Sequence, residues 1–329
     1  MALVNKFFLS TIVTYFLLFF GFLFYQIIQI YLKGVHHIPS SMYLLSLQGL
    51  SPISVSTEPI YFIIAHSLKA VLPLESVLPI ISQIIFGSLL YMFLKIAEPF
   101  SNEKKKLILI LAAFSFITIS NSEAIIRQGL GMIFFSVFLF SEYRIKWLYL
   151  ILAILSHNVF GIVAVFFILS ELVLKIRINI KSITAFFLLV FLSLYIQKIL
   201  YWLSEITNRT AYLDYSRAVI DFKYQFLAAM LFCGLLAGFH YFNQKNIAIR
   251  LISWKILVLT FSIIVMQFAF SGFPFIDRLI YIPLIYLPFL ICMFSIRPKF
   301  FAYIGYASFI VVNLIYMLNK TSVACEPYC

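Results

Sequence analysis

Two polar groups interrupt a stretch of sequence that is otherwise almost wholly apolar. Arg127-Gln128 stands near the start of the stretch 121–170, and Ser156-His157-Asn158 stands near its middle. Ionisable side chains in membrane-grade sequence are costly, so each is a candidate functional residue. Arginine is suited to bidentate binding of phosphate, and histidine can act as a general base near neutral pH. Together they could transfer a group from a lipid diphosphate to a hydroxyl acceptor.

Both groups also have a structural interpretation. Arg127 could extend to the lipid head groups from the end of a span. His157 could bond a backbone carbonyl at a helix end, with Asn158 as a cap. Gln128 beside Arg127, followed by Gly129 and Gly131, instead indicates close helix packing around a polar site.

The amino-acid composition is typical of a membrane protein. Of its 329 residues, 64% are hydrophobic and only 11% are charged, and the mean hydropathy is +1.05. Soluble domains contain about 25% charged residues. We therefore expect an all-α, polytopic integral membrane protein with about 10–11 transmembrane helices. The whole chain, 1–329, is expected to form a single transmembrane domain.

The elements that must position these residues follow from the apolar runs and their breaks. The run 147–174 is too long for one ordinary span and too short for two, so we expect two short helices meeting at the outer side, or one broken helix, around His157. The outer loops are expected at about 33–76, with a surface helix, and at about 201–222 and 272–278. The other expected spans are 7–32, 77–97, 107–120, 124–141, 182–200, 224–241, 256–271, 279–296 and 300–318.

The distribution of lysine and arginine predicts the orientation. With the N-terminus inside, every inner loop is basic, which agrees with the positive-inside rule. The net charge of +12 then reflects topology and the anionic membrane surface, and we expect no nucleic-acid partner. The outer side gathers a polar cluster close to span ends, from which Glu58, Arg217 and Arg278 join Arg127 as candidate ligands of a substrate.

Several motifs are absent from the sequence. It has no D-x-D for a metal-bound nucleotide sugar, no G-x-x-x-x-G-K-[ST] and no G-x-S-x-G. The sequence therefore fits a reaction on a lipid-linked donor, without metal or other cofactor, better than chemistry on a nucleotide sugar or ATP. Cys233 and Cys292 lie in apolar runs and are expected to be packing residues. Cys325 and Cys329 could form a disulfide if the C-terminal tail lies outside the cytoplasm.

The central stretch resembles a known family. The residues IIRQGLGMIFFSVFLFSEYRIKWLYLILAILSHNVF resemble the core of the EpsG-like branch of the Wzy polysaccharide polymerases. Tyr43 followed by Thr57-Glu58-Pro59-Ile60-Tyr61 is similar to the first outer loop of that family. Arg278-Leu279-Ile280-Tyr281 is similar to its late Arg-x-x-Tyr at a span start. One departure is that Ser40 and Ser41 stand where the family often has an Asp.

The resemblance implies a metal-independent glycosyltransferase of the bacterial inner membrane, with its active site on the periplasmic side. It would polymerise undecaprenyl-diphosphate-linked oligosaccharide repeats into O-antigen, capsular polysaccharide or exopolysaccharide. Its partners would be the lipid-linked donor and acceptor and membrane lipid, together with a chain-length regulator and a flippase. Under this hypothesis His157 is the base and Arg127 a catalytic diphosphate ligand. Substrate binding would involve Arg278, Arg217, Glu58, Gln128 and Tyr281.

Two other classes of protein remain as alternatives. A flippase for lipid-linked oligosaccharides would need a cationic cavity that reaches the membrane midplane and usually internal repeats. No convincing repeat relates the two halves of the chain. A membrane acyltransferase acting on surface polysaccharide also uses histidine and arginine, and would leave the length of the polymer unchanged.

Overall fold

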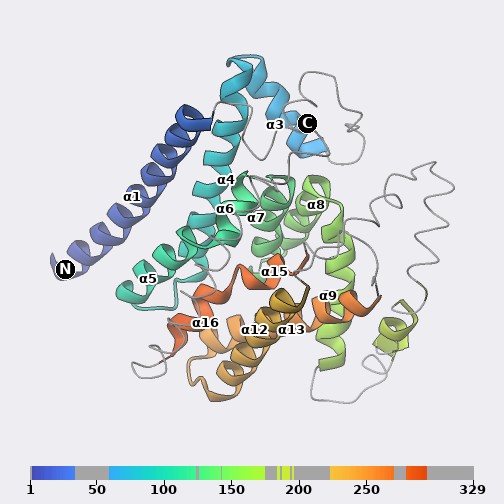
Figure 1. The fold of residues 1–329 in the computed structure, drawn as a ribbon. Coiled ribbons are helices and arrows are strands. Elements are labelled where there is room, and N and C mark those ends of the chain that lie inside the picture. The colour runs from blue at the N-terminus through green and yellow to red at the C-terminus, as the bar shows by residue number, and fades with distance from the viewer. Residues whose placement is uncertain are drawn as a thin grey trace. The chain divides into compact units, whose positions relative to one another are not determined.

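The computed structural model describes residues 2–33, 59–123, 126–141, 143–174, 184–185, 187–192, 195, 223–269 and 279–294. Within these ranges every regular element is a helix, as expected from the composition (Figure 1). The chain divides into two compact units. The first unit comprises Met1–Val137, Leu155–His157 and Ile291–Cys329, and the second comprises Phe138–Ile154 and Asn158–Leu290.

Helix α4 is the centre of the first unit. It runs from Leu74 to Ile96 and contacts α1 (Ala2–Lys33), α3 (Pro59–Lys69), α5 (Asn102–Ala113) and α6 (Phe116–Glu123). The bounds of α1 and α4 agree with the spans predicted at 7–32 and 77–97. Helix α3 lies within 33–76, where a surface helix is predicted, and it buries Tyr61, Phe62 and Ala65.

The contact between α1 and α4 depends on a small residue and on polar bonds to backbone carbonyls. Gly87 leaves room for the ring of Phe19, and its carbonyl oxygen accepts a hydrogen bond from the Tyr15 hydroxyl at 3.1 Å. Gln83 Nε2 donates to the carbonyl oxygen of Phe19 at 2.8 Å. Phe22 stacks on Phe86 with 3.9 Å between ring centroids. Small residues and interhelical hydrogen bonds are the usual means of joining helices in membranes.

The single span predicted at 107–120 is wrong. The chain forms α5 from Asn102 and then, after a break at Phe114 and Ser115, the separate helix α6. The Ser115 side-chain oxygen accepts a hydrogen bond from the Ile117 backbone N–H at 3.3 Å and so begins α6 with a cap. The segment 102–106, which lies between the spans predicted at 77–97 and 107–120, is already part of α5.

The second unit is held together mainly by α13 (Ile247–Ala269). This helix packs on α12 (Lys223–Asn243) and on α9 (Val159–Leu174). An added Cβ on Gly234 would lie 3.2 Å from Thr260 Cγ2, and the rings of Tyr241 and Trp254 lie 5.0 Å apart. Helices α12 and α13 are therefore antiparallel, as in a helical hairpin. The same unit contains most of α8 (Lys146–Ser156) and the short α15 (Tyr281–Leu284).

Two boundaries in the second unit differ from prediction. Helix α13 begins at Ile247, nine residues before the predicted span, because Asn246 Oδ1 accepts hydrogen bonds from the backbone N–H groups of Ala248 and Ile249. The span predicted at 279–296 is divided into α15 and α16 (Leu287–Met293). Pro288 lacks the backbone N–H that a continuous helix would use there.

Within the described ranges, three helices are long and apolar enough to cross a membrane, through Thr11–Ile28, Ser76–Ile96 and Ile247–Gln267. Shorter apolar helices cover Ile126–Phe140, Lys146–Ser156, Val159–Leu174 and Ala228–Asn243. The chain is thus a helical membrane protein. The predicted span at 300–318 lies outside the described residues, and the one at 182–200 is described only in part.

Candidate functional site

Four of the seven candidate site residues lie in the described part of the chain. Arg127, Gln128 and His157 belong to the first unit, and Tyr281 belongs to the second. The first unit therefore contains both residues expected to be catalytic. Glu58, Arg217 and Arg278 lie outside the described residues.

Arg127 is held at the beginning of α7 (Ile126–Phe140), one residue after the helix starts. Its side chain is half-buried, whereas the neighbouring Gln128 is only 1% exposed. The pair thus places a permanently charged group beside a fully buried amide.

Gly129 explains how α7 comes so close to its neighbours. A Cβ atom at this position would overlap the backbone carbonyl oxygen of Asn121 on α6 and would lie 3.0 Å from Ile85 Cγ2 on α4. Only a residue without a side chain fits here without movement of the backbone. The close packing predicted from the glycine after Arg127-Gln128 is confirmed, and α4, α6 and α7 meet next to the arginine.

A buried polar face of α6 lies at this junction. It consists of Thr118 and, three and four residues later, Asn121 and Ser122, all at most 1% exposed. Asn121 Nδ2 donates to the carbonyl oxygen of Ile117 at 2.8 Å, so its Oδ1 is turned away from that bond. Ser122 Oγ donates to the carbonyl oxygen of Thr118 at 2.8 Å.

The sequence interpretation missed this polar face of α6. Its signal was the segment ITISNSE, in which polar residues recur at helical spacing at the end of an apolar run. Ser82 on α4 and Gln128 on α7 are buried as well, at 4% and 1% exposure. Helices α4, α6 and α7 therefore bury more polar side chains than hydropathy suggested.

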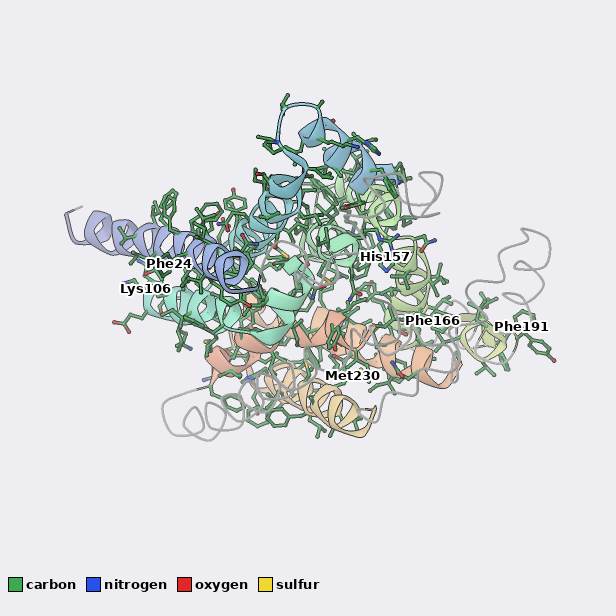
Figure 2. The ribbon with its side chains drawn as sticks, turned by 45° about the horizontal axis from the view of Figure 1, so that its top comes forward. Phe24, Lys106, His157, Phe166, Phe191 and Met230 are labelled. Carbon is green, nitrogen blue, oxygen red and sulfur yellow. The ribbon has the colours of Figure 1, made fainter. Side chains whose placement is uncertain are left out.

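His157 lies in the break between α8 and α9. Helix α8 ends at Ser156 and α9 begins at Val159, which confirms the break predicted around the polar triplet. Ser156 is fully buried, His157 is half-buried and Asn158 is exposed. Figure 2 labels His157 at the break and Phe166 farther along, within α9. The imidazole is thus placed on non-helical backbone between two apolar helices.

Tyr281 is the first residue of α15, and its side chain is half-buried. The next three residues, Ile282 to Leu284, are buried. The carbonyl oxygen of Pro283 accepts a weak hydrogen bond from the Cys233 thiol, with 3.6 Å between sulfur and oxygen. The position of Tyr281 is therefore determined by the packing of α15 on α12.

The chemical groups of the first unit suit the binding of an anion and the transfer of a proton. Arg127 supplies a fixed positive charge, and the imidazole of His157 can accept a proton. Among the residues that the structure describes, no group of three histidine, cysteine or acidic side chains could hold a metal ion.

The chain matches no protein-family model, and comparisons with characterised proteins and with solved structures find no significant match either.

Proposed function

We propose that the chain is a Wzy-type oligosaccharide repeat-unit polymerase. It would use an undecaprenyl-diphosphate-linked oligosaccharide as donor and a second lipid-linked repeat as acceptor, at the periplasmic face of a bacterial inner membrane. The product would be O-antigen, capsular polysaccharide or exopolysaccharide. The resemblance of the Arg127–His157 stretch to this family suggests the substrate, since the residues alone indicate only a lipid diphosphate and a hydroxyl.

The proposed reaction replaces one bond at a sugar carbon by another. A hydroxyl oxygen of the acceptor forms a bond to the anomeric carbon of the donor sugar, and the bond between that carbon and the diphosphate oxygen breaks. His157 accepts the proton of the attacking hydroxyl. Undecaprenyl diphosphate leaves, and Arg127 stabilises the negative charge that develops on it.

The observation that carries the proposal is the setting of Arg127. It is a half-buried arginine beside a fully buried Gln128, at a junction so tight that Gly129 contacts α4 and α6. A fixed charge in such surroundings interacts more strongly with an anion than a charge in bulk water does. Membership of 155–157 in the same compact unit agrees with a shared site for Arg127 and His157.

The remaining candidate residues have supporting roles in the proposal. Gln128 and Tyr281 would donate hydrogen bonds to the substrate. Arg278, Arg217 and Glu58 would bind the diphosphate or the acceptor from the outer loops.

The test uses a host strain from which the gene for this chain has been deleted. His157→Ala and Arg127→Ala are each restored in trans, and the surface polysaccharide is separated on a silver-stained gel. We expect a single-repeat band without the ladder of longer chains, while immunoblots of membranes show unchanged amounts of protein. His66→Ala and Arg250→Ala are matched controls because both side chains are exposed, and each should restore the ladder.

The other outcomes distinguish the alternatives. A normal ladder from His157→Ala or Arg127→Ala would remove that residue from the mechanism. Loss of even the single-repeat band in the deletion strain would indicate a flippase or an earlier step. A deletion that leaves chain length unchanged but removes acyl groups from the polymer would indicate an acyltransferase.

A further inference from the structure

Three consecutive lysines stand at the beginning of α5 and form a lysine cluster (Lys104, Lys105 and Lys106; Figure 2 labels Lys106). All three side chains are half-buried. Residues three and four positions apart share a face of a helix, so Lys105 is on the same face as the buried Ile108 and Leu109. The middle lysine therefore lies at the end of the face by which α5 packs on α1 and α4.

The lysine cluster lies close to the level of the lipid head groups. Helix α4 is apolar enough to cross the membrane through Ser76–Ile96, and only the short segment 97–101 separates it from α5. Near the end of α4, Tyr91 is 53% exposed, and Lys95 Nζ lies 5.7 Å from the centre of the Tyr91 ring. An exposed tyrosine beside a lysine is typical of the interface between membrane and water.

Helix α1 begins at the same interface. The Tyr15 hydroxyl bonds the carbonyl oxygen of Gly87, and the carbonyl oxygen of Phe19 accepts its bond from Gln83. Increasing residue numbers on α1 thus meet decreasing numbers on α4, so the two helices are antiparallel. The beginning of α1, the end of α4 and the beginning of α5 therefore lie on one face of the first unit. The distribution of lysine and arginine predicts that this face is cytoplasmic.

The acidic residues nearby do not neutralise the lysine cluster. Glu98 is already paired with Lys95, with 3.1 Å between oxygen and nitrogen. Glu103 is the one acidic residue in the first turn of α5, and it is exposed. Within the described part of the chain, Lys105 and Lys106 form no ion pair. Positive charge at the beginning of a helix also opposes the helix dipole, so this arrangement favours a negatively charged partner.

We infer that the lysine cluster binds the phosphate groups of anionic lipids in the leaflet next to which α4 ends. A lysine can pack its aliphatic stem along apolar surface while its ammonium group reaches the head groups, which agrees with three half-buried side chains. Anionic lipids give the cytoplasmic leaflet a negative potential that attracts basic residues. A phosphate bound here would offset the repulsion among the lysines and hold the ends of α1, α4 and α5 together.

The inference is independent of the proposed function. It uses neither Arg127 nor His157 and needs no particular reaction. A lipid partner is favoured over an acidic protein because half-buried stems direct the ammonium groups to the membrane surface and not far into water.

Lipid binding can be measured directly on the full chain. The protein is purified in detergent and titrated with phosphatidylglycerol or phosphatidylcholine, and native mass spectrometry gives the dissociation constant of the tightest-bound lipid. We expect phosphatidylglycerol to bind more tightly than phosphatidylcholine. Lys105→Gln and Lys106→Gln should each weaken the binding of phosphatidylglycerol roughly fivefold. Neither variant should change the binding of phosphatidylcholine.

Two double variants are matched controls. Lys105→Arg with Lys106→Arg keeps both charges and should keep the affinity. Lys245→Gln with Arg250→Gln removes the same number of charges from exposed positions at the turn between α12 and α13, and should leave the tightest binding unchanged. Equal weakening by this second pair would mean that only the net charge matters and would overturn the inference.

Thermal unfolding in nanodiscs provides a second measurement. Phosphatidylglycerol added to phosphatidylcholine nanodiscs should raise the unfolding temperature of the unchanged chain but not that of Lys105→Gln with Lys106→Gln. Lys106→Gln alone is used if the double variant does not accumulate. The same rise in both proteins, or no preference for phosphatidylglycerol in the unchanged chain, would contradict the inference. An equal rise caused by ATP in nanodiscs of phosphatidylcholine alone would indicate a soluble phosphate ligand and would overturn it as well.

Discussion

Lys255 on α13 and Glu171 on α9 form an ion pair with 3.0 Å between nitrogen and oxygen, across 84 positions of the chain. Their side chains are only 18% and 24% exposed, and the Lys255 ammonium nitrogen also lies 5.5 Å from the centre of the Phe167 ring. A partly buried pair of this kind joins two helices that are distant in sequence. The partners depend on each other, since either one alone would be a charge in apolar surroundings.

Neutralising both partners should therefore cost less than the sum of the two single neutralisations. Lys255→Met or Glu171→Gln should each lower the free energy of unfolding by about 1–3 kcal/mol, and the double variant by less than the sum of the two. Unfolding by sodium dodecyl sulfate in mixed micelles measures the three values. Strict additivity would mean that the pair contributes no coupling energy.

Gly129→Ala should destabilise the first unit because the added methyl group would overlap the Asn121 carbonyl oxygen, which cannot move without its helix. We expect a loss of about 1–3 kcal/mol, as for other overpacked positions. Gly161→Ala is the matched control, since its Cβ would lie 3.7 Å from Ile154 in ordinary contact. The same unfolding assay should show no loss for the control, because alanine favours helices. Equal stability of the two variants would argue against the tight α6–α7 junction.

Gly87→Val should weaken the attachment of α1 to α4. The first atom of the new side chain would lie 2.7 Å from Phe19 Cε2, so the Phe19 ring must move. Gly21→Val on α1 is the control, because nothing lies within 4 Å of its Cβ position. Unfolding in mixed micelles should show a loss of about 1–3 kcal/mol for Gly87→Val and little change for Gly21→Val. A larger effect at Gly21 would contradict the helix contact.

Cys233 should resist alkylation as long as the protein is folded. It is fully buried, and its thiol donates to the carbonyl oxygen of Pro283 at 3.6 Å. N-ethylmaleimide should modify it only after denaturation, as measured by peptide mass spectrometry. Phe242→Cys, at a position 76% exposed near the end of the same helix, should react in the folded protein. Rapid modification of Cys233 in folded protein would show that α12 and α15 separate readily.

The amino-acid sequence by itself determined the class of the protein and its strongest local signals. Long apolar runs predicted α1 and α4 because a segment in lipid must satisfy its own backbone N–H and C=O groups, which a helix does. Ser156-His157-Asn158 predicted the break after α8, since polar side chains compete for backbone groups at helix ends. Gly129 predicted the close approach beside Arg127 because it has no side chain.

Tertiary structure decided the helix boundaries that local hydropathy did not predict. Hydropathy predicts too late a start for α13 because Arg250 and Lys255 are charged, whereas Lys255 has a distant partner in Glu171. The division between α5 and α6 depends on the cap by Ser115 and on a polar helix face that packs within the protein. A charge or a hydroxyl in an apolar chain is stable only beside its partner, and that partner is set by packing and not by the neighbouring sequence.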